Sequence, residues 1–300
     1  QTLFLDYSVN PISSIQREIY LLQAVRPERI DPYYAYRMGA LGKKVVELVS
    51  PMRTAASEVR DPYYSDVEKA ISGTALTAKA PKLVDPAAYF ELMTRAAAEN
   101  DRLITYDYRS DIRINGVAGN ALSNDATRAV EAVSNIWYTI FNRPVKDSNI
   151  SKTDMRDYML KSIDFYLKND NIKEVDAVYA HAQAKGVLTP EIRKTVGDLY
   201  YDNEYYEEAL RIYHALLAVD PRQPEVSKRI AMYHILMGDR AVKAENLEEA
   251  LDAYTLAVHA DPLEDEGSRK LASIEIIIGK RDNRNMTQQD LGRRAQQLEA

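Results

Sequence analysis

The sequence feature that most constrains the fold of this chain is a pattern of small, aromatic and proline residues with a period of about 34 residues. Counted from Pro190 as position 1, the pattern places Gly197 at 8, Tyr200 at 11, Tyr206 at 17, Ala209 at 20, Tyr213 at 24 and Pro221 at 32. Small residues let two helices approach closely, and aromatic residues fill the space between them. Proline ends a helix because it cannot continue the hydrogen-bond ladder. The stretch 190–223 therefore predicts a pair of packed helices.

This series resembles the tetratricopeptide repeat family, a helix-turn-helix unit. A downstream copy at 231–264 carries Gly238, Ala241, Leu247, Ala250, Tyr254, Ala257 and Pro262. An upstream copy at 156–189 keeps Tyr166, Ile172, Tyr179 and Ala182 but has Ile163, Val175 and Val187 where the family has a small residue, Ala and Pro. The resemblance covers less than half of the chain, and it implies an α-solenoid of about three helix-turn-helix repeats at 151–280.

Three segments lie between or after the repeats. Pro224 to Ile230 separates the central copy from the downstream one, and its seven residues are close to two helical turns. We therefore expect this insertion to lengthen the next helix without rotating its apolar stripe. Asp265 to Gly279 predicts the first helix of a partial fourth unit (265–280). Thr287 to Ala300 predicts a separate last helix within 281–300, with Thr287 as its N-cap, so that these helices cap the solenoid.

Residues 1–145 lack this period, yet they also read as helical. Four dipeptides predict helix starts: Asn10-Pro11, Asp31-Pro32, Asp61-Pro62 and Asp85-Pro86. The side chain of Asn or Asp accepts hydrogen bonds from the unpaired backbone N–H groups of the first turn, and the fixed φ of Pro suits the first helical position. Asp125 to Phe141 predicts a helix with Val130, Val133, Trp137 and Ile140 facing inward. Leu103 to Gly116 alternates loosely and predicts a short hairpin or an ordered loop. Arg143 to Lys152 reads as the joint to the repeats.

Tyrosine is unusually frequent, with 21 Tyr against 4 Phe and 1 Trp. Repeat positions account for many of them. The pairs Tyr33-Tyr34 and Tyr63-Tyr64 lie outside the repeats, and we expect that both members of a pair cannot face one core. Because Tyr combines apolar area, a hydroxyl and little rotamer entropy, some of these residues are candidates for an interface.

The groove of the repeats is the site with a geometric basis. In the resembled family, the first helix of each unit lines the concave surface, which implies groove positions for Asp164, Asp198 and Asp239. Members that grip a C-terminal carboxylate use Asn and Lys or Arg there, whereas Asp would repel such a ligand. Asp164–Lys168 and Asp239–Lys243 are also i, i+4 pairs that could simply be solvated. The predicted groove, for a partner's basic segment, consists of Asp164, Lys168, Lys194, Asp198, Tyr201, Asp202, Asp239 and Lys243.

Composition and motifs argue against several other classes of site. The chain has no Cys, and its four His, at 181, 214, 234 and 259, show no metal-ligand spacing, so we expect no metal and no cofactor. Residues 151–300 carry the whole acidic excess, 27 acidic against 21 basic side chains, and no basic face for nucleic acid. The most apolar run, Leu271 to Gly279, is interrupted by Ser273 and Glu275, so no membrane-spanning segment is expected.

The sequence therefore predicts an all-α protein: a helical, Tyr-rich N-terminal domain (1–145), a solenoid and a C-terminal helix. The leading function is a non-enzymatic scaffold or adaptor that docks a protein partner within a larger assembly. A structural subunit of a cell-envelope or filament complex is the alternative, and a membrane-associated complex stays open. A second alternative is an enzyme with its active site in 1–145, for example around Asp107, Arg109, Asp111 and Arg113. The lack of Cys suits an oxidising compartment, so an extracytoplasmic location, periplasmic or secreted, is expected over the alternative of the cytoplasm.

Overall fold

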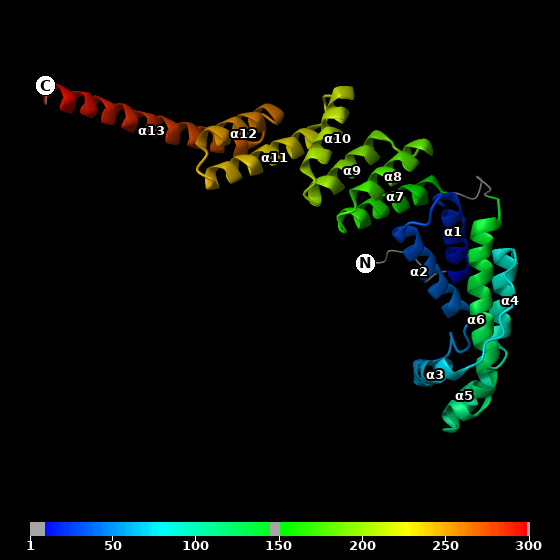
Figure 1. The fold of residues 1–300 in the computed structure, drawn as a ribbon. Coiled ribbons are helices and arrows are strands. Elements are labelled where there is room, and N and C mark those ends of the chain that lie inside the picture. The colour runs from blue at the N-terminus through cyan, green and yellow to red at the C-terminus, as the bar shows by residue number, and fades with distance from the viewer. Residues whose placement is uncertain (1–9, 145–150, 299–300) are drawn as a thin grey trace. The chain divides into compact units, whose positions relative to one another are not determined.

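The computed structural model describes residues 10–144 and 151–298. Within these ranges every regular element is a helix and no strand occurs, which confirms the expectation of an all-α protein. Contacts between Cα atoms divide the chain into two compact units, Gln1–Tyr158 and Met159–Ala300 (Figure 1). None of the described helices combines the length and the apolar character that crossing a membrane would require.

The first unit is built around one long helix, α6, against which α1, α2 and α4 pack. Its core contains Ile19, Leu41, Val45 and Ile136, all almost fully buried. The elements of this unit are α1 (Pro11–Ala24), α2 (Pro32–Val49), α3 (Ser57–Ala70), η1 (Ile71–Gly73), α4 (Pro86–Ala98), α5 (Asp101–Arg109), η2 (Arg113–Asn115), α6 (Val117–Asn142) and the first turns of α7 (Lys152–Leu167). The expected hairpin or loop at Leu103–Gly116 is therefore wrong, since this stretch holds most of α5 and all of η2.

Three of the four predicted helix starts are confirmed. Asn10, Asp31 and Asp85 are N-caps whose side chains accept backbone N–H groups, and a proline follows each one. The fourth start is wrong, because α3 begins at Ser57 and Pro62 lies inside it. Proline removes one hydrogen bond from that helix. Burial of Val59 and Tyr63, one turn apart on the same face, anchors the helix across this position.

Tyr33 and Tyr34 are both buried, at 1% and 0% exposure, so neither is available as the interface residue for which it was a candidate. Their rings enter different neighbourhoods. The ring of Tyr33 contacts that of Tyr158 in α7, with centroids 5.1 Å apart, whereas Tyr34 packs against Phe141 and donates its hydroxyl hydrogen to the carbonyl of Leu22. Two separate contact regions in one unit thus satisfy adjacent side chains.

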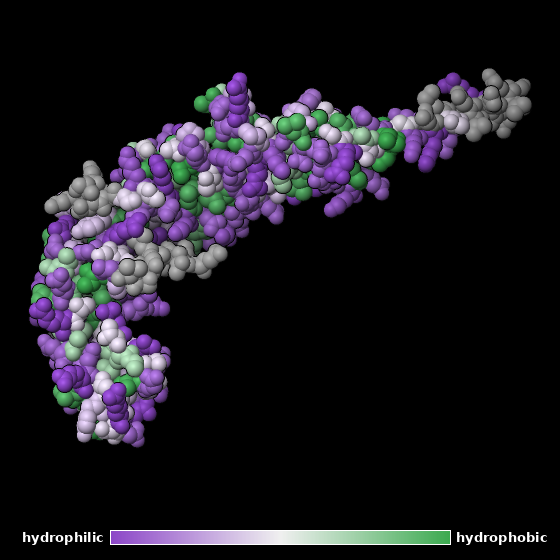
Figure 2. All heavy atoms as spheres, turned by 180° about the vertical axis from the view of Figure 1, so that it is seen from behind, coloured by the Kyte–Doolittle hydropathy of each residue, from purple (hydrophilic) through white to green (hydrophobic). Residues whose placement is uncertain are grey.

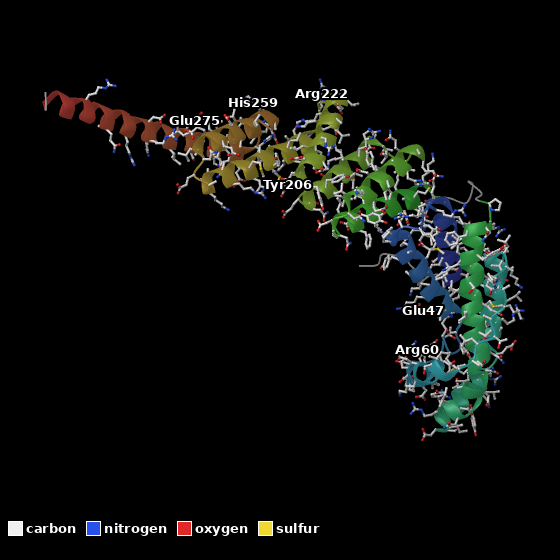
Figure 3. The ribbon with its side chains drawn as sticks, in the orientation of Figure 1. Glu47, Arg60, Tyr206, Arg222, His259 and Glu275 are labelled. Carbon is white, nitrogen blue, oxygen red and sulfur yellow. The ribbon has the colours of Figure 1, made fainter. Side chains whose placement is uncertain are left out.

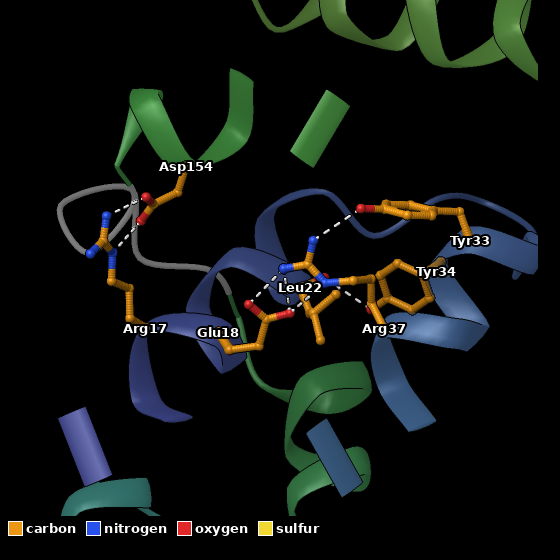
Figure 4. Close-up of polar contacts among 7 residues, drawn as sticks. All are labelled: Arg17, Glu18, Leu22, Tyr33, Tyr34, Arg37 and Asp154. Atoms are coloured by element: carbon orange, nitrogen blue, oxygen red, sulfur yellow. Dashed lines mark hydrogen bonds and ion pairs between the residues drawn. The ribbon is translucent and has the colours of Figure 1, made fainter. Parts of the chain in front are cut away.

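A buried ion pair stands beside these tyrosines (Figure 4). Arg37 donates to both carboxylate oxygens of Glu18 at 2.7 and 2.8 Å and to the Tyr33 hydroxyl at 3.2 Å. Burial raises the pKa of the Tyr33 hydroxyl, although Arg37 opposes the shift. Nearby, Arg17 pairs with Asp154, and the Arg37 guanidinium lies over the Tyr158 ring, so two contacts hold the first turns of α7 in this unit.

An extended segment, residues 74–84, runs along α6. Its backbone N–H groups need acceptors because the segment belongs to no helix. Side chains spaced one helical turn apart on α6 supply them: Thr127, Glu131, Asn135 and Thr139 accept from the N–H groups of Thr77, Lys79, Lys82 and Val84. A polar ridge on α6 therefore fixes a stretch of chain that has no regular structure of its own.

The second unit consists of successive helix pairs, visible side by side in Figure 1. After the remainder of α7, these are α8 (Ile172–Ala184), α9 (Pro190–Asp202) with α10 (Tyr206–Val219), α11 (Pro224–Lys243) with α12 (Leu247–Ala260), and α13 (Asp265–Leu298). Helix α11 has 20 residues where α9 has 13, so the insertion 224–230 lengthens the first helix of its pair, as expected.

Helix α13 is a single continuous element, so the expected separate helix at Thr287–Ala300 is wrong; residues 299–300 lie outside the described residues. No proline interrupts the sequence 265–298, and Gly279 alone does not break the helix. Thr287 is therefore an internal helical residue. Ile274 packs with Ala250 and Tyr254 of α12, which seats the first half of α13 on the preceding pair.

Candidate protein-binding site

In two helix pairs, a Gly-Asp dipeptide on the first helix contacts a tyrosine side chain of the second helix. Tyr213 of α10 donates its hydroxyl hydrogen to Asp198 of α9 at 2.7 Å, and Tyr254 of α12 donates to Asp239 of α11 at 2.7 Å. Each aspartate follows a glycine, Gly197 or Gly238, on which the tyrosine ring lies. A Cβ added at Gly197 would stand 2.7 Å from Cε1 of Tyr213, and one at Gly238 would collide with the ring of Tyr254. The Gly-Asp and Tyr positions therefore belong together.

Each of these aspartates also binds a cation from the helix that begins the next pair. Arg229 of α11 lies 3.5 Å from Asp198, and Lys270 of α13 lies 2.7 Å from Asp239. Burial alone would raise the pKa of Asp239, but the hydrogen bonds from Lys270 and Tyr254 hold it below its usual value. The spacing from aspartate to cation is 31 residues in both cases. One carboxylate thus joins its own helix pair and links it to the next.

The central predicted residues do come together on α9. Lys194 stands one turn earlier on α9 and donates to Asp198 at 2.9 Å. Burial would lower the pKa of Lys194, but hydrogen bonds to Asp198 and Glu225 raise it above its ordinary value. Arg229 also reaches Asp202 at 3.3 Å. The carboxylates of this copy are therefore largely neutralised by the chain itself, and Asp202, with 58% of its side chain exposed, is the more accessible one.

The outer predicted residues behave differently. Asp164 and Lys168 of α7 form the expected i, i+4 pair at 2.6 Å. Asp239 instead pairs with Lys270, so the expected Asp239–Lys243 pair is wrong; Lys243 is an exposed residue in the last turn of α11. A cation there complements the negative end of the helix. The three aspartates thus do not form one continuous ladder of free carboxylates.

Beside Asp202 lies a group of half-buried rings that we call the tyrosine cluster: Tyr201, Tyr206 and Tyr233. It joins three helices, because Tyr201 of α9 lies 5.2 Å from Tyr206 of α10 and Tyr206 lies 5.5 Å from Tyr233 of α11, between centroids. Arg229 stacks 4.9 Å from the Tyr201 centroid, and Arg240 lies 5.9 Å from that of Tyr206. Figure 3 labels Tyr206 on this unit. Tyrosine and arginine are the residue types enriched in the centres of protein interfaces.

Sequence reasoning placed Tyr201 but missed Tyr213, Tyr254, Arg229 and Lys270 as partners of the aspartates. A signal for them was present. Aspartate precedes tyrosine by 15 residues and the next cation by 31 residues in both well-formed copies. The upstream copy has the same 15-residue spacing from Asp164 to Tyr179, but buried Ile163 occupies the glycine position and no hydrogen bond joins that pair in the described structure.

The candidate catalytic residues of the first unit do not converge. Asp107 accepts the N–H of Val117 at 2.6 Å and so caps α6, whereas Arg113 binds Asp66 at 3.0 Å. Asp111 and Arg109 are exposed. No group of three or more potential metal ligands occurs among the described residues, and the histidines lie on separate helices.

A cavity of about 950 Å³ does occur in the first unit, between α2, α3 and α6. Three residues expected to face inward on α6, Val130, Val133 and Trp137, line this cavity, and Val130 and Trp137 are 40% and 39% exposed. Of the four, Ile140 alone is fully buried. The face of α6 that packs into the core of the unit instead contains Ala132, Ile136 and Ile140. Trp137 still packs on α2, where its ring lies beside Gly42 and its indole N–H donates to the carbonyl of Met38.

Comparison with known protein families, with curated proteins and with solved structures found no match.

Proposed function

We propose that this chain is a non-enzymatic scaffold that docks a protein partner, and that its helix pairs form an α-solenoid like that of tetratricopeptide repeats. The close glycine-tyrosine approach within each of the pairs α9–α10 and α11–α12 supports the repeat assignment. So does the aspartate-to-cation link that joins each of those pairs to the following helix. Nearest-neighbour packing of this kind is what holds a solenoid together.

The tyrosine cluster is the observation that carries the proposed docking function. Its rings are only half buried, although they contact one another across three helices, so one side of the group is available to a partner. Large rings held in fixed positions lose little rotamer entropy on binding. Figure 2 shows other apolar side chains in small patches between polar ones on the visible face. Scattered patches of this kind are ordinary for a protein surface.

The charge of the partner follows from the pairing of the aspartates. Asp198 is already bound by Lys194, Arg229 and Tyr213, so it has little capacity for a further cation. Asp202 is mostly exposed. We therefore infer that the partner segment contacts the rings first and that a basic residue, where it has one, approaches Asp202.

Photo-crosslinking in cells that natively produce the protein tests this function. Tyr233 is replaced by the photoreactive p-benzoylphenylalanine in the full chain, and exposed Tyr106 of α5 is replaced in the matched control. We expect a discrete protein adduct at Tyr233 and none at Tyr106. Adding Tyr201→Ala should reduce the adduct by about tenfold or more, as expected for an interface hot spot.

Two further variants separate ring contacts from charge. Asp202→Asn should weaken capture less than Tyr201→Ala and make it less sensitive to salt, because a rim carboxylate acts mainly on association. Asp252→Asn makes the same chemical change at an exposed residue of α12 and should have no effect. Equal adducts at Tyr233 and Tyr106, or an adduct that survives Tyr201→Ala unchanged, would contradict docking at the tyrosine cluster.

The alternative of a structural subunit has one observation in its favour. Ile276 and Ile277 of α13 are 57% and 47% exposed, and Leu263, in the loop before α13, is 90% exposed. Such residues suit a chain covered by neighbours in a large assembly. Adducts of comparable strength at many surface positions, rather than at the tyrosine cluster, would favour this alternative.

A further inference from the structure

The cavity of the first unit has the size and lining of a small-molecule site. Its volume of about 950 Å³ lies at the upper end of the range for ligand pockets. Aliphatic side chains of α2, α3 and α6 line it together with Ile71 of η1 and Leu76, and three rings join them: Tyr63, Tyr64 and Trp137. Glu47, labelled in Figure 3 near the end of α2, and exposed Arg53 also line it.

One polar group in this wall has an unused bonding capacity. The side chain of Asp125 is only 10% exposed, and its Oδ1 accepts a hydrogen bond from Arg128 at 2.5 Å. Its Oδ2 is buried and accepts no hydrogen bond from any described residue. Buried carboxylate oxygens are normally satisfied, because an unpaired one loses its hydration without compensation. Burial raises the pKa of Asp125, although Arg128 opposes this shift.

The position of this oxygen indicates what kind of ligand would complete the site. Asp125 forms part of the cavity wall, and the terminal torsion of an aspartate is soft, so its carboxylate can turn to meet a donor bound in the cavity. A hydrogen-bond donor on a ligand would then satisfy it. A positive charge suits the carboxylate better than a neutral donor does, and the faces of the surrounding aromatic rings also attract cations.

We propose that this cavity binds a small amphipathic amine, with an apolar or aromatic body against the rings and a protonated nitrogen donating to Asp125. An acid of the same shape would meet the negative charge of Asp125 in the cavity wall, and Arg128 is already paired with that carboxylate. An alcohol would satisfy the hydrogen bond but not the charge. The site lies wholly in the first unit and does not depend on the proposed docking of a protein partner in the second.

The chain provides its own reporter for this site. Trp137 is the only tryptophan in the sequence, and it lines the cavity. Its fluorescence can therefore be titrated in the full-length protein with three probes that share one body: 4-phenylbutylamine, 4-phenylbutan-1-ol and 4-phenylbutyrate. We expect saturable binding of the amine, at least about tenfold tighter than that of the alcohol or the acid.

Two variants and one control make the test specific. Asp125→Asn keeps an oxygen for Arg128 and removes the charge, so the preference for the amine over the alcohol should disappear. Ala129→Leu occupies part of the cavity and leaves Asp125 in place, so it should weaken the binding of all three probes. This variant keeps the proposal testable even if Asp125→Asn does not fold. Asp252→Asn in the second unit should change nothing. Equal binding of amine and alcohol by the parent, an unchanged preference in Asp125→Asn, or no saturable binding of the amine would overturn the proposal.

Discussion

At the scale of single residues, the pairing of charged and aromatic side chains separates what the sequence predicted from what it missed. The sequence placed Lys194, Asp198 and Asp202 in one predicted groove, but it did not reveal that Arg229 of the next helix binds both aspartates. Tyr33 and Tyr34 were candidates for an interface, yet both are buried, each in a contact region of its own. Both omissions have one cause, because local spacing along a helix does not reveal which side chains other elements supply.

The buried pair Glu18–Arg37 gives a prediction at this scale. Glu18→Gln removes the negative charge that faces the buried Arg37 guanidinium, which should lower the free energy of unfolding by about 3–5 kcal/mol. Glu47→Gln is the matched control, because Glu47 forms an exposed pair with Lys44 on α2 and should cost at most about 1 kcal/mol. Urea unfolding of both variants measures the difference. Equal small losses would mean that the Glu18–Arg37 charge pair contributes little to stability.

At the scale of elements, helix starts were predictable where a capping residue followed by a proline marks them. Asn or Asp followed by Pro marked the starts of α1, α2 and α4, and the seven-residue insertion lengthened α11 as expected. The start of α3 and the continuity of α13 were missed. Segment 74–84 could not be foreseen either, since its conformation depends on acceptors that α6 presents about 50 residues away in the sequence.

The contact between α11 and α12 gives a prediction at this scale. Gly238→Ala places a methyl group against the ring of Tyr254 and should cost about 1–3 kcal/mol through overpacking. Gly279→Ala in α13 is the matched control, because a Cβ there meets nothing, and the gain in helix propensity should stabilise the protein by about 0.5–1 kcal/mol. Thermal or urea unfolding of the two variants should show changes in the free energy of unfolding with opposite signs. A stabilising effect of Gly238→Ala would show that the ring of Tyr254 does not lie on Gly238.

At the scale of the whole molecule, the chain consists of two units with separate cores. The division falls inside α7, between Tyr158 and Met159, because Asp154 and Tyr158 make their contacts with α1 and α2. The sequence indicated a change of character at 143–152, but it could not show that the next helix would begin in the first unit; residues 145–150 lie outside the described residues. The cavity was missed for a similar reason, since its walls come from three helices.

We propose above all that the second unit is a stack of helix pairs that contact only their neighbours, and that the pairs α9–α10 and α11–α12 are each stabilised by an aspartate-tyrosine contact. Hydrogen exchange of the full-length parent and of Gly238→Ala, compared amide by amide under native conditions, tests it most directly. Local opening should follow the packing, so protection should fall most in α11 and α12, less in α10 and the first half of α13, and remain unchanged in α1, α2 and α6. A uniform loss of protection through both units would contradict the claim.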